Sequence, residues 1–293
     1  MKHTLLIGDS HTGIFHGQPN IVVYGHDDGL YTARNYGELV DQPDSRLNGF
    51  YQSFKGSETD VILCIGEVEI RAHWWKHIPA EHVNGKDFKI YIKECAERLY
   101  RAIKITVDRY EFSSVLLWGA PPATGNTNYN PAWPFIGSVS TRNILTHLFN
   151  HAIIECLNQD PTEKRIKFAT GFYDYIDPET FLPTFNIPSD GVHWSSPLRD
   201  FVWNIVNKLL TEDYQVYANP LFDQLKSQTF KISSTTASTT WLYDTWILSK
   251  NLQNPQDHDR KITVNGEDYH LIRLEKRDVF PETYTELCLA VNT

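Results

Sequence analysis

The sequence has few cysteines, fewer basic than acidic side chains and no long apolar run. Its four cysteines form no Cys-x-x-Cys pair and show no metal-ligand spacing, which argues against a disulfide framework or a zinc site. Cys64 and Cys156 lie in apolar segments, so we expect them to be small core residues of a protein in a reducing compartment. The net charge of −9 argues against nucleic-acid partners, because phosphate binding requires clustered Lys and Arg.

Other absences concern membranes and cofactors. No apolar run reaches the roughly 18 to 20 residues that span a bilayer, and the first apolar stretch, 5–7, is too short for a signal peptide. We therefore expect a cytoplasmic protein that does not bind membranes. There is no Walker loop and no Gly-x-Gly-x-x-Gly, so no nucleotide cofactor is expected. His73 and His77 have the spacing of helical zinc ligands but no HExxH motif, and we expect neither a metal nor a cofactor.

The first two thirds of the chain alternate between short apolar runs and amphipathic stretches. The runs are continuous rather than alternating, which is typical of strands buried on both faces of a parallel sheet. Strands are predicted at 3–8, 20–25, 60–66, 113–119 and 166–170. Helical periodicity covers 88–109, 141–157 and 198–210, the last of these after Pro197. This alternation predicts right-handed βαβ crossovers and a three-layer α/β/α sandwich.

The pattern changes near residue 213. Residues 233–240 are polar and β-branched, without helical periodicity, and more candidate strands follow at 241–248, 261–264, 269–274 and 285–291. The Asn265-Gly266 step is a hairpin signal. We predict an α/β domain over 1–212 and a small β-rich module over 213–293. Trp241, Tyr243 and Trp246 could form a carbohydrate-binding platform there, although core packing explains them better.

Three segments with reactive side chains follow predicted strands. Ligands of an open parallel sheet collect beyond the carboxyl ends of its strands. Ser10 follows the first strand, 66–71 follows the third, and Asp190 and His193 precede the last helix of the domain. A serine nucleophile needs a base to take its proton, and the base needs an orienting carboxylate. The spacing of three residues between Asp190 and His193 lets one turn hold such an acid and base together.

These segments resemble a known family. Gly8-Asp9-Ser10 near the N-terminus and Asp190-Gly191-Val192-His193 near the end of the α/β domain are similar to the first and last sequence blocks of the SGNH/GDSL hydrolases. The resemblance covers residues 1–212. It implies a flavodoxin-like α/β/α domain and hydrolysis of an ester, often an acetyl group on a sugar. The implied roles are nucleophile for Ser10, base for His193 and partner of the base for Asp190.

The resemblance also implies an oxyanion hole. Its donors would be the backbone N–H of Ser10 and that of a second-block glycine, for which Gly29 is the first choice and Gly37 the second. The third block departs from the family pattern, because Gly66-Glu67-Val68-Glu69-Ile70-Arg71 has valine where Gly-x-Asn-Asp has its oxyanion-binding asparagine. It is similar to a Gly-Glu-Ile-Asp-Cys-Arg variant associated with polysaccharide-related proteins.

Losing one oxyanion donor can lower a rate by about 10²- to 10³-fold. Arg71 could compensate for this loss, could bind an anionic substrate group, or could simply pair with Glu67 or Glu69. The segment 124–133 after the fourth predicted strand is rich in amides and aromatics, which suit sugar hydroxyls and sugar faces but also occur in ordinary long loops.

The sequence thus predicts a serine esterase that hydrolyses acyl groups, with an O-acetyl ester on a carbohydrate as the expected substrate. The predicted partner is accordingly a small-molecule or glycan ester. The expected substrate-binding residues are Asp9, Gly66, Glu67, Arg71, Asn126 and Trp133. Two alternatives stay open: an O-acyltransferase with the same triad, and a non-catalytic glycan-binding protein on this fold.

Overall fold

The computed structural model describes most of the chain. It covers residues 2–24, 32–70, 85–124, 139–184, 193–225, 230–234, 245–249, 260–264, 267–274 and 287–291. Several residues singled out in the sequence lie outside these ranges: Gly29, Arg71, His73, His77, Asn126, Trp133, Asp190, Trp241 and Tyr243.

A six-stranded sheet forms the centre of the molecule. Its order is β2-β1-β3-β4-β5-β6, and every neighbouring pair is parallel. The strands are β1 (His3–Gly8), β2 (Ile21–Val23), β3 (Thr59–Cys64), β4 (Ser114–Trp118), β5 (Ile166–Ala169) and β6 (Val216–Tyr217). All residues of β3 and β4 are buried, which explains their continuous apolar sequences. The parallel sheet predicted from the sequence is confirmed.

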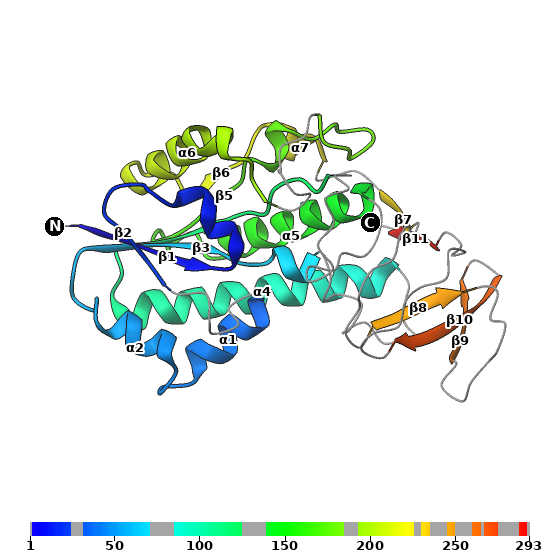
Figure 1. Ribbon diagram of the computed structural model, residues 1–293, viewed down its shortest axis with the longest axis horizontal. Helices are drawn as coiled ribbons and strands as arrows, with labels where there is room; N and C mark the ends of the chain where they lie inside the picture. The colour runs from blue at the N-terminus through cyan, green and yellow to red at the C-terminus, as the bar shows by residue number, and fades with distance from the viewer. Residues whose placement is uncertain are drawn as a thin grey trace.

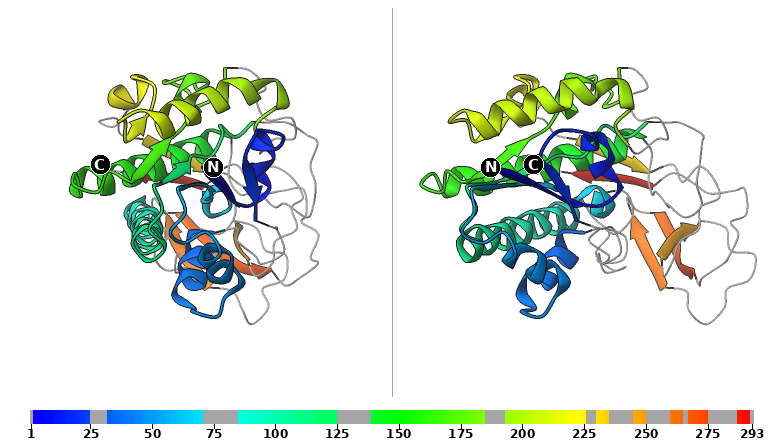
Figure 2. Two further views of the ribbon diagram at one scale, coloured as in Figure 1. Left: turned by 90° about the vertical axis from the view of Figure 1, so that its left-hand side faces the viewer. Right: turned by 60° about the vertical axis from the view of Figure 1, so that its left-hand side comes forward.

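Helices cover both faces of this sheet (Figures 1 and 2). One face carries α1 (Ala33–Asp41), α2 (Arg46–Gln52), α4 (Gly85–Tyr110) and α5 (Val139–Gln159). The other face carries the 3₁₀ helix η1 (Ser10–Phe15) and α6 (Arg199–Thr211), which follows the 3₁₀ turn η6 (Ser196–Leu198). The molecule is therefore the three-layer sandwich that the sequence predicts.

Side-chain alternation along the strands divides the core in two. In β1, Leu5 and Ile7 pack with α1, α4 and α5, whereas Leu6 between them packs with η1 and α6. Two free cysteines belong to these layers, since Cys64 and Cys156 are both buried as predicted. None of the helices in the described part of the chain is long and apolar enough to cross a membrane.

The sequence analysis assigned no helix to the stretch that contains α1 and α2. Both helices begin at a side-chain cap: Thr32 Oγ1 accepts from Asn35 N at 3.0 Å, and Ser45 Oγ accepts from Asn48 N at 3.2 Å. The two helices have only 9 and 7 residues, which leaves about two turns in which a helical period can be recognised.

Beyond residue 212 the chain first completes the α/β layers. Strand β6 extends the sheet, and Phe222 and Leu225 of α7 (Leu221–Leu225) join its core. Further strands are β7 (Phe230–Ser234), β8 (Thr245–Ser249), β9 (Arg260–Val264), β10 (Glu267–Leu274) and β11 (Leu287–Val291). All pairs among these five are antiparallel, and Val264 lies opposite Glu267, as the hairpin signal between them predicts. The division into two domains stays a prediction.

Candidate active site

The site lies where β1 and β3 end side by side. The strand order reverses direction at this point, since the chain goes from β1 outward to β2 and then returns to β3 on the other side. Such a switch point in a doubly wound sheet leaves a crevice at the carboxyl ends of the strands. Ser10 comes just after β1, and Gly66 and Glu67 come just after β3.

A glycine and an aspartate set the exit of the chain from β1. Gly8 has φ +149°, and a Cβ there would lie 2.2 Å from the carbonyl oxygen of Cys64, so only glycine fits. Asp9 caps η1: its Oδ1 accepts from His11 N at 2.9 Å, and its carbonyl accepts from Thr12 N at 3.1 Å. Asp9 is buried, whereas Ser10, the first residue of η1, is exposed.

The exposed hydroxyl of Ser10 contacts a histidine that lies 183 residues further along the chain. Ser10 Oγ lies 2.5 Å from His193 Nε2. The neighbour of this histidine, Trp194, is buried and packs against Trp118 and Tyr175, with ring centroids 5.9 and 6.0 Å away. These contacts anchor the backbone that presents His193. A serine hydroxyl within hydrogen-bond reach of an imidazole is the arrangement of a nucleophile and its base.

A second histidine, His11, lies against the first. The ring of His11 is 4.7 Å from that of His193, measured between centroids, with an angle of 47° between their planes. His11 Nε2 also lies 3.4 Å from Glu67 Oε2, and both side chains are largely buried. The sequence analysis passed over His11, although it directly follows Ser10.

The group formed by Asp9, His11 and Glu67 has the donor types of a metal site. Its candidate ligand atoms all lie within 4.8 Å of one another. One oxygen of Asp9 already accepts from the His11 backbone, and Glu67 pairs with the His11 ring. These contacts within the protein explain why the three side chains lie together. The sequence-based expectation that the protein has no metal stays a prediction.

The turn after β3 contains the third sequence block. Gly66 has φ +115°, and a Cβ on it would lie 2.9 Å from the ring of Phe149, so a side chain is excluded. Val68, in this turn, has no side-chain donor to offer to an oxyanion.

Glu69 of this turn has a buried carboxyl group, which lies next to the first turn of α1. It is 1 % exposed, and Arg34 N donates to its Oε1 at 3.3 Å. Burial raises the pKa of Glu69 to about 8, against the lowering effect of the hydrogen bonds from the first turn of α1. The sequence predicts Glu69 only as a possible partner for Arg71, because a pattern of residue types does not reveal that a carboxylate is buried.

Of the two glycines that the sequence offers for the oxyanion hole, one is excluded by its position in the structure. Gly37 lies inside α1, where its N–H belongs to the helical hydrogen-bond ladder, and it faces Arg98 and Ala102 of α4. This location leaves Gly29 as the predicted second donor. Gly29 belongs to the part of the chain that the structure does not describe, as do the predicted site residues Arg71, Asn126, Trp133 and Asp190.

Comparison with known proteins gives distant structural matches. No protein-family model and no curated protein sequence matches the chain. The structure of a putative platelet activating factor from Streptococcus pneumonia is 19% identical, with a TM-score of 0.46, over 71% of this chain and 84% of that one. A carbohydrate acetylesterase family member from Sinorhizobium meliloti is 14% identical, with a TM-score of 0.41, over 72% and 99%.

Est24, a carbohydrate acetylesterase from Sinorhizobium meliloti, is 15% identical, with a TM-score of 0.40, over 71% of this chain and 99% of that one. Identities this low carry no information about the reaction. The function therefore has to be inferred from the geometry of the site.

Proposed function

We propose that the protein is a serine esterase in which Ser10 is the nucleophile and His193 the general base. The observation that carries this proposal is the 2.5 Å contact between Ser10 Oγ and His193 Nε2. The contact joins residues far apart in the chain, and it lies at the carboxyl ends of parallel strands, where ligands of such sheets bind. Attack on an ester carbonyl requires an accessible hydroxyl and a base positioned to take its proton.

The reaction runs in two steps. His193 takes the proton of Ser10 as Oγ attacks the ester carbonyl, and it then gives that proton to the leaving alcohol, which leaves an acyl group on Ser10. Water, activated by the same histidine, attacks the acyl-serine, and the acid is released while Ser10 regains its proton. Asp190 is proposed to orient His193, and the N–H groups of Ser10 and Gly29 are proposed to bind the oxyanion.

The proposed substrate is an O-acetyl ester on a carbohydrate. Support comes from the resemblance of the sequence blocks to the SGNH/GDSL hydrolases and from the amide- and aromatic-rich segment with Asn126 and Trp133. Release of acetate from a panel of acetylated glycans tests this substrate class, and no release from any of them would contradict it. Transfer of acetyl groups to an added sugar faster than to water would instead indicate an acyltransferase.

Labelling tests the nucleophile directly. A fluorophosphonate probe should modify wild-type protein at Ser10, because a serine paired with a base attacks phosphorus readily. Peptide mass spectrometry should locate the label, which Ser10→Ala should abolish and His193→Ala should slow. Ser53→Ala, which removes an exposed hydroxyl at the end of α2, is the control and should label like wild type. Label elsewhere, or none, would contradict the proposal.

One observation favours a second function. Val68 offers no donor where the family has its oxyanion-binding asparagine, which is what a glycan-binding protein without catalysis would tolerate. That function predicts glycan binding that Ser10→Ala leaves unchanged, together with no serine-dependent turnover. The labelling experiment separates the two, since a binding protein has no need of an activated serine.

A further inference from the structure

We propose that His11, held by Glu67, is a positioning residue that keeps the ring of His193 in line with Ser10. This inference rests on the proposed function, because it assigns a role within the same site. Ser10 contacts the edge of the His193 ring at Nε2, whereas the ring of His11 lies against it at 4.7 Å between centroids. Together the two contacts define both the direction and the tilt of the imidazole.

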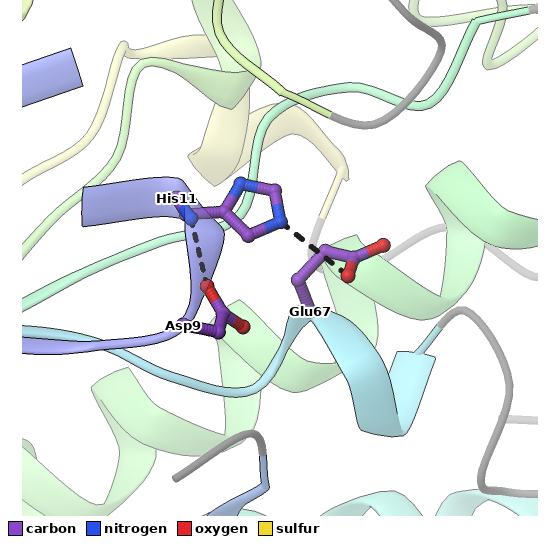
Figure 3. A group of neighbouring side chains, drawn as sticks. All are labelled: Asp9, His11 and Glu67. Atoms are coloured by element: carbon purple, nitrogen blue, oxygen red, sulfur yellow. Dashed lines mark hydrogen bonds and ion pairs between the residues drawn. The ribbon is translucent and has the colours of Figure 1, made fainter. Parts of the chain in front are cut away.

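His11 is itself firmly held. It is 6 % exposed, its backbone N–H donates to Asp9 Oδ1 at 2.9 Å, and its Nε2 lies 3.4 Å from Glu67 Oε2 (Figure 3). Glu67 in turn follows Gly66, which packs against Phe149 of α5. His193 is therefore held, through His11 and Glu67, by the turn that follows β3 rather than by a surface loop.

The position of His11 in the chain strengthens this role. His11 is the neighbour of Ser10 in η1, so one short segment supplies both the hydroxyl and the ring that contact His193. A shift of η1 then moves the two contacts together and preserves their relative geometry. Proton transfer between Ser10 and His193 requires such constancy, because a misplacement of about 1 Å can cost about 10²-fold in rate.

Kinetics of His11 variants test the role. His11→Ala should lower kcat by about 10- to 100-fold with little change in KM, because it loosens the base without removing a substrate contact. His11→Phe keeps an aromatic ring but loses the contact with Glu67, so it should recover only part of that loss. His151→Ala is the control, since it removes a histidine in a similar pair, with His151 Nδ1 3.6 Å from Glu155 Oε1 on α5. Equal kcat in His11→Ala and wild type would overturn the proposal.

A double-mutant cycle tests the part assigned to Glu67. If Glu67 acts through His11, Glu67→Ala should lower kcat on its own but add little to His11→Ala. Full additivity of the two losses would show that Glu67 acts independently and would overturn this part of the inference. Thermal unfolding of each variant identifies any that fail to fold, and His11→Phe keeps the test open if His11→Ala is one of them.

A readout without turnover separates this inference from the proposed function. The ring ¹⁵N and ¹H NMR signals of His193 should change in His11→Ala and change less in His11→Phe, whether or not the protein hydrolyses esters. Unchanged His193 signals in His11→Ala would refute the positioning role even in an active enzyme. Zn²⁺ that raises the melting temperature of wild type but not of His11→Ala would also refute it, because His11 would then be a metal ligand.

Discussion

Two glycines allow the close packing at the ends of β1 and β3 on which the site is built. Gly8 and Gly66 both have positive φ, and a Cβ on either would collide, with the carbonyl of Cys64 and the ring of Phe149 respectively. The sequence predicts both glycines as strand ends. It does not predict why glycine is required, because the colliding atoms come from residues distant in the chain. Nor does it predict the contact of His11 with His193.

Replacement of Gly66 by alanine should therefore destabilise the protein. The positive φ and the 2.9 Å approach to Phe149 together should lower the free energy of unfolding by about 2 to 4 kcal/mol. Gly49→Ala is the matched control, because Gly49 lies in α2 with nothing within 4 Å of its Cβ position. That change should stabilise by about 0.4 to 1 kcal/mol. Urea unfolding measures both, and equal effects would contradict the steric account.

At the scale of elements, length decides which helices the sequence reveals. The long α4 and α5 extend over 26 and 21 residues, and both were predicted to within a few residues. The short α1 and α2 bury tyrosines instead: Tyr36 Oη lies 2.9 Å from Thr106 Oγ1 and 3.1 Å from Tyr51 Oη. Such bonds connect side chains far apart in sequence, so no local sequence pattern predicts them.

Glu69, in the turn that follows β3, should make the free energy of unfolding depend on pH. Burial raises the pKa of Glu69 from its usual 4.5 to about 8. Below pH 4.5 the carboxyl is protonated in both the folded and unfolded states and costs nothing. As the pH rises towards 8 the unfolded state ionises first, so the folded state loses stability relative to it, and the loss levels off above pH 8.

The substitution Glu69→Gln removes this titration and keeps the shape of the side chain. Its stability relative to wild type should therefore grow between pH 4.5 and 8, by a few kcal/mol in total, since each pKa unit corresponds to about 1.4 kcal/mol. Glu38→Gln, which removes an exposed carboxylate of α1, is the control. Parallel curves of unfolding free energy against pH for Glu69→Gln and wild type would contradict this account.

For the whole molecule, the sequence predicted the layers but not the order of the strands. Continuous apolar runs such as 60–66 and 113–119 indicate strands buried on both faces, and this establishes a parallel sheet between helices. Strand order depends on pairing between distant segments, which periodicity does not encode. The order found in the structure places the switch point between β1 and β3, and so brings Ser10 and Glu67 to the same end of the sheet.

The central claim is that Ser10 and His193 act as a nucleophile and its base. Hydrolysis of p-nitrophenyl acetate by wild type, Ser10→Ala and His193→Ala, followed over a range of pH, tests it most directly. We predict that both variants lose about 10³-fold or more in rate, and that the wild-type rate rises with pH because the base must be unprotonated to accept the serine proton. Equal, near-background rates in all three proteins would contradict the claim.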